Sequence, residues 1–476
     1  MQDTGRKQEM TDHLARMKAA QIRDGAPSAQ VRKDRLDRAI ALLVDHREAL
    51  GQAMSDDFGH RSPVVNDFAD IGGSIKSLKT AKKNVEKWMR AEKRGVDFPL
   101  GLFGAKAHVH HVPKGVVGIM SPWNFPVAMV FQPLAGIVAA GNRAMIKPSE
   151  FTEGTSALMG ELIPKYFDPE ELSVFTGGPE VGAAFSALDF DHIIFTGATG
   201  IAKHVMRAAS DTLTPLTLEL GGKSPAILGR TADLEKAAAR IMAGKTLNAG
   251  QICLAPDYAL TPHDMTGQFV DHARASVERM YPTMKDNPDY TSMVNQRHYD
   301  RMMGYLEDAR DKGAEVIEIN PAGENFSQQP HHKIPPHLIL EPTDEMEVMK
   351  NEIFGPLLPI KSYRDISEAI GYVNDRDRPL GLYAFGDDKE TTQIVNSTTS
   401  GGVTVNDVIM HVASEDTPFG GIGPSGMGHY HGYDGFREFS HQKTVFKQTG
   451  VEKVAGILRP PYSKTTDKIV AGMIKK

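Results

Sequence analysis

The sequence predicts an α/β protein built around a doubly wound, parallel sheet of the dinucleotide-binding kind. Its 476 residues correspond to roughly three domains of about 150 residues each. After Lys114, short apolar runs alternate with helix-sized segments, which is typical of βαβ units whose sheet is buried on both faces. Polar and glycine residues directly follow several of these runs, where sheets of this kind bind their ligands. We therefore expect the chemistry at the carboxyl edge of the sheet.

The composition is that of an ordinary globular protein. Lys and Arg together number 54 and Asp and Glu 60, so the formal net charge is -6, and 40% of the residues are hydrophobic and 24% charged. This balance excludes a disordered chain and lacks the basic footprint of a nucleic-acid-binding protein. We expect no nucleic-acid partner.

The cysteine content and the apolar segments indicate the cellular compartment in which the protein is expected. Cys253 is the only cysteine, so it cannot close a disulfide within the chain or build a thiolate metal cluster, and a reducing cytoplasm is expected. The amino terminus shows no apolar signal region. The best membrane candidate, residues 127–140, is shorter than the ~20 residues that a span requires and contains Pro133, so we expect no membrane span.

The elements up to residue 113 are expected to be helices followed by a ribbon. Residues 6–94 are rich in charge, with apolar residues such as Leu42, Leu43 and Leu50 at helical spacing, which predicts packed amphipathic helices. Residues 98–104 and 107–112 resemble the two strands of a hairpin, which predicts a projecting β-ribbon.

The parallel sheet should follow, and a second α/β stretch after it. The predicted strands are residues 116–120, 143–146, 173–176, 192–196 and 216–220. The predicted crossover helices are residues 127–140, 155–165 and 201–210. The second stretch begins after Gly222, and the glycine-rich run 418–426 is expected to be a loop near its end.

Three residues are candidates for catalysis. Cys253 follows small and polar residues that leave a thiolate and its backbone N–H open to a ligand, although a lone cysteine is more often a buried apolar residue. Glu219 ends an apolar strand, where a carboxylate is costly unless it is functional or held in a salt bridge or helix cap. Asn124 precedes a helix, so its amide could stabilise an oxyanion or merely cap that helix.

Several other polar segments are less specific. Lys147 and Glu150 follow the second predicted strand and could hold ribose hydroxyls or form a solvated loop. Residues 197–200 do not form a Gly-x-Gly-x-x-Gly fingerprint and indicate only a strand, a turn and a helix. The histidines within 108–111 and 429–431 lack a carboxylate or cysteine at ligand spacing, so we expect no metal site.

Seven motifs, in their order and spacing, resemble those of the aldehyde dehydrogenase superfamily, from about Val116 to Val445. They are Pro122-Trp123-Asn124-Phe125-Pro126, Lys147-Pro148-Ser149-Glu150, Phe195-Thr196-Gly197, Leu218-Glu219-Leu220-Gly221-Gly222-Lys223, Gln251-Ile252-Cys253, Glu352-Ile353-Phe354-Gly355-Pro356 and Pro418-Phe419-Gly420-Gly421. Residues 253–258, 406–407 and 423–432 are similar to the branch that holds the dimeric class 3 and fatty aldehyde enzymes, and most of all to bacterial coniferyl-aldehyde dehydrogenases.

The resemblance implies a thiol mechanism. Cys253 would attack the aldehyde carbon, and the Asn124 side-chain amide and the Cys253 backbone N–H would stabilise the oxyanion. Hydride transfer to the nicotinamide would leave a thioester, and Glu219 would activate the water that hydrolyses it. A coenzyme A-dependent acylating enzyme is disfavoured, because such relatives generally lack a base at the position of Glu219.

The resemblance also implies the cofactor contacts. Glu352 would hold the nicotinamide ribose, Lys147 and Glu150 the adenine ribose, and Gly197 the turn near the pyrophosphate. Because Glu150 would repel a 2′-phosphate, NAD is expected rather than NADP, although the motif departs from many relatives after Gly200. The full expected set is Pro122, Trp123, Lys147, Ser149, Glu150, Gly177, Thr196, Gly197, Leu220, Gly221, Glu352 and Phe354.

The implied architecture joins a Rossmann-type NAD domain to an α/β catalytic domain and a β-ribbon for oligomerisation. We expect the NAD-binding domain at residues 1–95 and 114–220 and the catalytic domain at 221–423. Residues 96–113 and 424–450 would form the bridging element, and 451–476 a soluble tail. A homodimer is expected first and a tetramer second, because unpaired ribbon edges invite association.

The substrate is expected to be an aromatic aldehyde like coniferyl aldehyde, with medium- or long-chain aliphatic aldehydes as the alternative. A protein that keeps the fold without catalysis is the alternative from another class. A pocket for an aromatic aldehyde should be lined by aromatic and apolar side chains. The candidates are Trp123, Tyr258, Phe354, Met410, His411 and Phe419.

Overall fold

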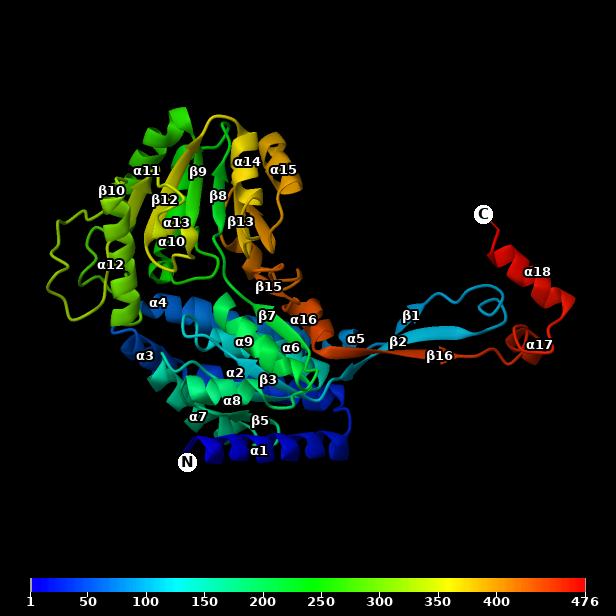
Figure 1. Cartoon of the computed structure of the whole chain (residues 1–476). Coiled ribbons are helices and arrows are strands. Elements are labelled where there is room, and N and C mark those ends of the chain that lie inside the picture. Colours follow the sequence, from blue (N-terminus) through cyan, green and yellow to red (C-terminus); the bar gives the residue numbers. More distant parts are fainter. Residues whose placement is uncertain (1, 476) are drawn as a thin grey trace.

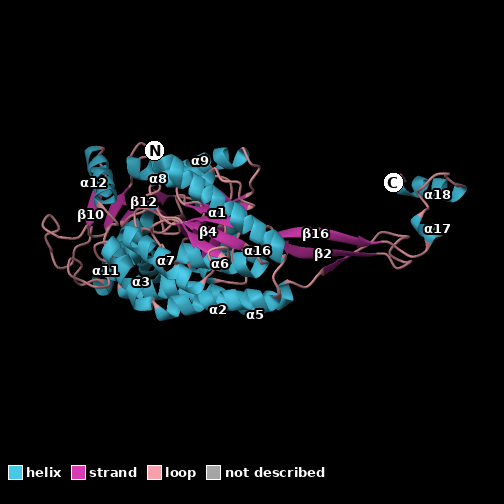
Figure 2. Cartoon of the chain, turned by 90° about the horizontal axis from the view of Figure 1, so that it is seen from below, coloured by secondary structure: helices cyan, strands magenta, loops and turns pink. Residues whose placement is uncertain are grey.

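The computed structural model describes residues 2–475, which form a two-part α/β body and a projecting arm (Figure 1). The first part holds the amino-terminal helices and a six-stranded sheet, and the second holds a seven-stranded sheet. Long strands lead from the body to a pair of helices at the far end of the arm (Figures 1 and 2). Across residues 2–475, no helix is both long and apolar enough to cross a membrane.

The first sheet has the strand order β15-β7-β6-β3-β4-β5. Its strands are β3 (Val116–Met120), β4 (Arg143–Lys147), β5 (Leu172–Val174), β6 (His192–Thr196), β7 (Leu216–Glu219) and β15 (Gly426–Met427). All are parallel except β15, which pairs antiparallel with β7. The five parallel strands lie in the Rossmann order, because the first strand along the chain is central and the next two extend to one side. This confirms the predicted fold class, with strand ends within two residues of those expected.

Alternate residues of these strands enter two different cores. Val117, Ile119 and Ile146 pack in the core beneath one group of helices, and Met120 and Met145 in the core beneath the other. The first group is α2 (Ala29–Asp45), α3 (Arg47–Asp57), α5 (Gly73–Trp88), α6 (Ala128–Ala140) and α7 (Glu153–Tyr166), and the second is α1 (Gln2–Asp24), α8 (Pro179–Ser186) and α9 (Thr199–Ser210). Burial on both faces explains why these strands are continuously apolar.

The second sheet has the order β10-β11-β12-β9-β8-β13-β14, with only β10 antiparallel. Its strands are β8 (Pro225–Leu228), β9 (Tyr258–Pro262), β10 (Glu315–Glu318), β11 (His337–Leu340), β12 (Leu357–Tyr363), β13 (Gly381–Phe385) and β14 (Gly402–Val405). The accompanying helices are α10 (Leu234–Thr246), α11 (Thr266–Met280), α12 (Gln296–Asp311), α13 (Glu347–Lys350), α14 (Ile366–Asn374) and α15 (Asp388–Ser397), with the 3-10 turns η2 (Leu247–Gly250), η3 (His263–Met265) and η4 (Met410–Ala413).

The structure of the arm differs in part from the sequence prediction. Its sheet consists of β1 (Glu92–Arg94), β2 (Lys106–Pro113) and β16 (Ser440–Lys447), with β2 in the middle. Residues 98–104, expected to be a strand, form turns instead. Pro99 cannot donate a ladder hydrogen bond, and Gly104 has a φ of 91°, so this segment reverses direction more readily than it extends.

The segment 424–450, expected entirely in the bridging element, divides between body and arm. β15 pairs with β7, and α16 (Gly432–Glu438) packs against α6, so both belong to the body. β16 then runs into the arm, and α17 (Glu452–Ala455) and α18 (Lys464–Met473) follow at its tip. The remaining short elements, α4 (Pro63–Val65) and the π-helix η1 (Asn66–Gly72), join α3 to α5.

Candidate active site

A cavity of about 280 Å³ lies at the carboxyl edge of the first sheet, where it meets the second part of the body. Strand register brings the ends of β6 and β7 together there, with Thr196 opposite Glu219. The predicted residues that line the cavity are Asn124, Glu219, Cys253, Pro122, Trp123, Thr196, Gly197, Leu220, Gly221, Glu352 and Phe354. All three catalytic candidates and most of the cofactor candidates thus meet in one place.

The loop before Cys253 has an unusual backbone. Asn248 and Ala249 have φ values of 50° and 52°, and Gly250 has 73°, so three successive residues are left-handed. A Cβ on Gly250 would lie 2.3 Å from the carbonyl oxygen of Gly355, so glycine is required there. Such strain concentrates at functional sites, where the surroundings impose it. Cys253, three residues after Gly250, lines the cavity.

The thiol of Cys253 is half-buried and is not in a disulfide. Burial raises its pKa, and the carboxyls of Glu352 and Glu219 raise it further. The backbone N–H groups of Cys253 and Leu254 act in the opposite direction. In the protein alone the thiol is therefore protonated at neutral pH, so the nucleophilic thiolate must form during the catalytic cycle.

Glu219 is the last residue of β7 and is 3% exposed. Neither carboxylate oxygen has a hydrogen-bond partner among residues 2–475, so the salt bridge and the helix cap considered from the sequence are not formed. Desolvation raises the pKa of Glu219 well above its usual value, and the Glu438 carboxyl adds to this. An unpartnered buried carboxyl of raised pKa can take a proton from water near neutral pH, which suits a general base.

Asn124 is held by the nucleophile loop rather than by the helix that follows it. Its Nδ2 donates to the carbonyl oxygen of Gln251 at 3.0 Å. The first N–H groups of that helix, those of Val127 and Ala128, instead donate to Asp70 Oδ1 at 3.1 and 2.9 Å. Asn124 is therefore not the cap of this helix, and its second amide N–H is available to a ligand oxygen.

Two residues that support Asn124 were not predicted from the sequence. The Arg61 guanidinium donates to the Asn124 carbonyl oxygen at 3.1 Å and to Asn248 Oδ1 at 3.1 Å. It also donates to Met54 Sδ at 3.2 Å and pairs with Asp70 at an N–O distance of 2.8 Å, and both charged side chains are fully buried. The pair thus connects the amino-terminal helical layer to Asn124 and to the strained loop before Cys253.

The residues expected at the nicotinamide ribose form a compact group. Glu352 Oε1 is buried without a partner within the described chain, and burial raises the Glu352 pKa to about 8. A Cβ on Gly221 would lie 2.2 Å from Glu352 Oε2, so only glycine allows the carboxyl to take this position. An orphaned acceptor beside bare backbone fits a ribose hydroxyl.

The aromatic wall of the cavity includes a residue that sequence reasoning missed. The Trp123 ring lies 4.8 Å from His298 and 5.3 Å from Phe354, between ring centroids. Arg301, also missed, donates to the Ile353 carbonyl oxygen at 2.8 Å. Both come from α12, more than forty positions away from any motif, so no local signal marked them.

The four remaining cofactor candidates lie outside this cavity. Lys147 is 5% exposed, and its Nζ contacts Glu150 Oε2 at 3.1 Å. Ser149 Oγ accepts from the Phe151 N–H at 3.2 Å. Gly177 follows β5 with a φ of 146°, and a Cβ there would lie 2.4 Å from Val181. Lys147 ends β4, Ser149 and Glu150 follow it, and Gly177 comes after β5, so the four lie farther along the same carboxyl edge of the sheet.

The carboxyl edge of the first sheet also offers an anion site that suits a pyrophosphate. Helix α9 starts directly after the turn at Gly197, and its cap, Ala198, supplies no side-chain hydrogen bond. The first N–H groups of a helix without a side-chain cap are free to bind phosphate oxygens. With the orphaned Glu352 oxygen, the residues present fit a nicotinamide dinucleotide. Within residues 2–475, no cluster of three metal-ligating side chains is found.

Comparisons with known proteins agree with this geometry. The model of the aldehyde dehydrogenase family matches residues 3–445. The chain is 61% identical over 474 residues to the probable coniferyl aldehyde dehydrogenase of Caulobacter vibrioides, which covers 99% of this chain and 98% of that protein. It is 52% identical over 468 residues to the coniferyl aldehyde dehydrogenase of a Pseudomonas species, and the match covers 98% of this chain and 96% of that protein. A substrate-bound structure of Staphylococcus aureus AldH has a TM-score of 0.91 at 35% identity, covering 98% of this chain and 99% of that one. The chain therefore belongs to the aldehyde dehydrogenase family and is an oxidoreductase that acts on aldehydes.

Proposed function

We propose that this enzyme oxidises an aromatic aldehyde of the coniferyl type to its carboxylic acid, with NAD as the hydride acceptor. The observation that carries the proposal is the meeting of Cys253, Glu219 and Asn124 in one cavity with the residues suited to a nicotinamide nucleotide. The substrate class is supported by two relatives, 61% and 52% identical over nearly the full chain, that carry the coniferyl aldehyde dehydrogenase name.

Each catalytic residue has one task in the proposed reaction. The Cys253 thiolate attacks the aldehyde carbon, while Asn124 Nδ2 and the Cys253 backbone N–H donate to the developing oxyanion. A nicotinamide nucleotide bound at this edge would supply the hydride acceptor, and loss of hydride turns this carbon into the acyl carbon of a thioester on Cys253. Glu219 takes a proton from water, the hydroxide adds to the acyl carbon, and the C–S bond breaks to release the acid and the thiolate.

The cofactor would lie along the carboxyl edge of the first sheet. Its nicotinamide ribose is assigned to Glu352, Phe354 and Gly221, and its pyrophosphate to the start of α9 at Thr196 and Gly197. Its adenosine end is assigned to Lys147, Ser149, Glu150 and Gly177, with Pro122, Trp123 and Leu220 lining the nicotinamide end. The exposed Glu150 carboxylate would repel a 2′-phosphate, which favours NAD over NADP.

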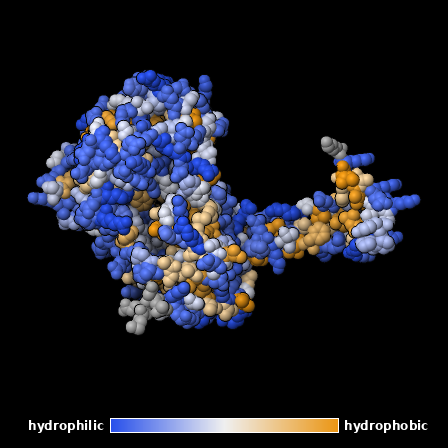
Figure 3. All heavy atoms as spheres, in the orientation of Figure 1, coloured by the Kyte–Doolittle hydropathy of each residue, from blue (hydrophilic) through white to orange (hydrophobic). Residues whose placement is uncertain are grey.

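We further propose a homodimer, with the arm as its contact surface. Apolar side chains are exposed along the arm and at its tip, where Figure 3 shows apolar surface. Phe98 and Leu102 are about three-quarters exposed, and Phe446 about half. Exposed apolar surface of this kind marks an interaction site, and a ribbon edge can pair with another strand. Because the chain has only one cysteine, we place the enzyme in the reducing cytoplasm.

A substrate panel tests the proposal. NADH formation would be followed by absorbance with coniferyl aldehyde, benzaldehyde, hexanal and decanal, and kcat/KM compared between NAD and NADP. The proposal expects the highest kcat/KM for coniferyl aldehyde with NAD. Preference for decanal would keep the mechanism but make the enzyme a fatty aldehyde dehydrogenase. No turnover of any aldehyde would favour a protein that keeps the fold without catalysis.

A further inference from the structure

Four hydrogen-bonded side chains form a network that runs across the first sheet beside the catalytic base. Lys114 Nζ lies 3.0 Å from His192 Nδ1, and His192 Nε2 lies 2.8 Å from Thr217 Oγ1. Thr217 Oγ1 donates to Glu438 Oε1 at 2.6 Å. His192 on β6 and Thr217 on β7 are fully buried, while Lys114 and Glu438 are partly exposed. No step of the proposed reaction uses this network.

The hydrogen bonds of the network all point the same way. An ammonium group can only donate, so Lys114 donates to His192 Nδ1. Burial lowers the pKa of His192 well below its usual value, and Lys114 adds to this, so the ring is neutral and its one proton is on Nε2. Nε2 therefore donates to Thr217, whose hydroxyl proton goes to Glu438. Hydrogen bonds ordered from a cation to a carboxylate polarise and strengthen one another.

The two ends of the network are fixed at the root of the arm. Lys114 directly follows β2, and Glu438 is the last residue of α16, just before β16. The buried Asn142 accepts from the Gly115 N–H at 2.9 Å and donates to the Phe439 carbonyl oxygen at 2.8 Å. These bonds tie the chain neighbours of Lys114 and Glu438 to one side chain. The separation of the two ends is therefore set by the backbone as well as by the network.

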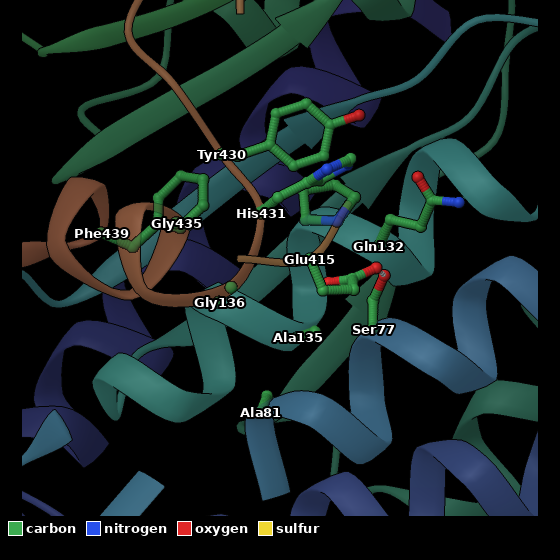
Figure 4. Close-up of a pocket in the computed structure, with 12 residues that line it drawn as sticks. Ser77, Ala81, Gln132, Ala135, Gly136, Glu415, Tyr430, His431, Gly435 and Phe439 are labelled. Atoms are coloured by element: carbon green, nitrogen blue, oxygen red, sulfur yellow. Dashed lines mark hydrogen bonds between the residues drawn. The ribbon is translucent and has the colours of Figure 1, made fainter. Parts of the chain in front are cut away.

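Helix α16 lies closely on α6, which fixes the position of Glu438. Gly136, Gly435 and Phe439 line a small cavity where the two helices meet (Figure 4). A Cβ on Gly136 would lie 3.0 Å from the carbonyl carbon of Gly435, so glycine lets the helices approach each other. The Phe439 ring also meets the His192 ring edge-on, with centroids 5.5 Å apart. Glu438 thus projects from a helix end that is held on two sides.

The network reaches the catalytic base through β7 and two glycines. Thr217 and Glu219 are two residues apart on β7, so their side chains lie on the same face of the strand. A Cβ on Gly428 would lie 2.5 Å from Glu438 Oε1. A Cβ on Gly420 would lie 3.1 Å from Glu219 Oε1 and 2.2 Å from the Gly428 carbonyl oxygen. Glycine backbone thus lies between the two carboxyl groups and keeps them close together.

Glu438 acts on Glu219 through its charge. After burial, the Glu438 carboxylate is the group that raises the pKa of Glu219. The Cys253 thiol, from the nucleophile loop, and the Tyr430 hydroxyl, from the segment after β15, also face Glu219. Burial raises the pKa of both groups, so both are uncharged at neutral pH. The cation that faces Glu438 is Lys114, at the far end of the network.

We propose that Thr217 is a positioning residue that holds the Glu438 carboxylate beside Glu219 and so controls thioester hydrolysis. His192 and Lys114 orient the Thr217 hydroxyl for this role. The inference rests on the proposed role of Glu219 as the base. A carboxylate held beside Glu219 repels a second negative charge, so Glu219 keeps its proton to a higher pH and is a stronger base once it has lost it. The network thereby sets the pH at which hydrolysis begins.

The test measures how thioester hydrolysis depends on pH in variants of Thr217. Rapid quench would follow the carboxylic acid formed in a single turnover with NAD and the panel aldehyde of highest kcat/KM, while NADH absorbance reports hydride transfer separately. Thr217→Val nearly keeps the shape of the side chain but cannot donate to Glu438. Its acidic limb should move down by about one pH unit, so that the rate on that limb rises about tenfold. Thr217→Ser keeps the hydroxyl and should restore the wild-type profile.

Thr214→Val is the matched control. Thr214 is also a buried threonine, but it lies outside the network and donates to the Phe190 carbonyl oxygen at 3.1 Å. This variant should leave the pH profile of hydrolysis unchanged. A Thr217→Val limb that stays in place, as in Thr214→Val, or that moves to higher pH would overturn the proposal.

Glu438→Asp tests the same inference without a change in the core. Glu438 is partly exposed, so its variants should fold even if Thr217→Val does not. Aspartate keeps the charge but is one methylene too short to keep the bond to Thr217. Glu438→Asp should therefore move the acidic limb in the same direction as Glu438→Gln. A wild-type profile in Glu438→Asp would mean that the charge acts without being positioned, and would overturn the proposal.

A double variant tests whether Thr217 acts through Glu438. Thr217→Val combined with Glu438→Gln should give the profile of Glu438→Gln alone, because the side chain that Thr217 holds is then uncharged. Additive changes would overturn the proposal and leave Thr217 a structural residue.

Glu219→Gln separates this inference from the one on which it rests. If Glu219→Gln turns over normally, Glu219 is not the base, and the proposed mechanism fails together with the role of Thr217. If Glu219→Gln slows after a burst of NADH while Thr217→Val keeps the wild-type profile, the base stands and only the role of Thr217 is wrong.

Discussion

Arg61 and Asp70 form a fully buried ion pair, 2.8 Å between Nη2 and Oδ2, that joins the helical layer to the active site. Such a pair is expensive to desolvate and seldom adds stability relative to apolar residues. Its hydrogen bonds explain its presence better, because Arg61 reaches Asn124 and Asn248 while Asp70 caps α6. We interpret the pair as a positioning device for the oxyanion-binding amide.

Arg61→Lys should therefore lower kcat more than it alters binding. Lysine keeps the charge opposite Asp70 but lacks the planar fork that reaches two acceptors at once. We expect kcat to fall about tenfold, because misplacing a donor by a fraction of an ångström weakens oxyanion stabilisation, with the KM for NAD unchanged. The matched control is Arg32→Lys, since Arg32 is also buried and donates to Pro27 and Ala139 carbonyls far from the cavity. A similar loss of kcat in both variants would reduce Arg61 to a structural role.

Cys253→Ala should abolish hydride transfer and keep cofactor binding. The variant removes only the nucleophile, and the cavity wall that would hold the nicotinamide ribose, Glu352 and Gly221, is unchanged. Stopped-flow absorbance should show no NADH, while titration with NAD should give the wild-type Kd. NADH formation by this variant at more than a trace would contradict the role of the thiol.

Glu219→Gln should separate hydride transfer from the hydrolysis of the thioester. The glutamine amide cannot take a proton from water, so a pre-steady-state burst of NADH should appear and turnover should then slow by about 100-fold or more. Glu438→Gln is a useful companion, because this neighbouring carboxyl raises the Glu219 pKa without reaching the cavity. It should move the acidic limb of the pH–rate profile to lower pH and preserve turnover at its maximum. Normal turnover of Glu219→Gln would exclude it as the base.

Stability of the enzyme without cofactor should depend on the protonation of Glu352. Its pKa is raised from 4.5 to about 8, chiefly by burial, so the native state binds a proton that the unfolded state has released in this window. The stabilisation is full below about pH 4.5 and is lost as pH rises toward 8, with a slope that approaches ~1.4 kcal/mol per pH unit. Glu352→Gln should not lose this stabilisation as the pH rises. The Tm of the variant should therefore increase relative to the Tm of the wild type between pH 5 and 8. Parallel Tm curves would contradict the shift.

Glu150→Ser should weaken the preference for NAD. Removing the carboxylate removes its repulsion of a 2′-phosphate, so the ratio of kcat/KM for NAD to that for NADP should fall about tenfold or more. Lys147 would then be released from its contact with Glu150 and become free to pair with the phosphate. Glu153→Ser, on the following helix, is the control and should leave the ratio unchanged.

The parts of this molecule that could be predicted from sequence are those with local signals. The strands of the first sheet are short apolar runs between helix-sized segments, and Cys253, Glu219 and Asn124 lie in motifs that are contiguous along the chain. Arg61 could not be found in this way, because its hydrogen bond to Asn248 spans 187 positions and nothing in its neighbours marks it. The prediction of a ribbon hairpin is wrong in part because a local signal there is misleading. Residues 98–104 have apolar side chains that resemble a strand, but Pro99, Gly101 and Gly104 favour turns.

The two-residue strand β15 has a consequence for synthesis on the ribosome. It covers the outer edge of β7 with Gly426 opposite Glu219, so the edge beside the base is closed by residues that emerge some 200 positions later. Until then a nascent chain carries a nearly finished nucleotide-binding sheet whose β7 edge is open, which invites pairing with other chains. The catalytic base thus acquires its final surroundings last, and premature termination before residue 426 should give an aggregation-prone product rather than a partially active one.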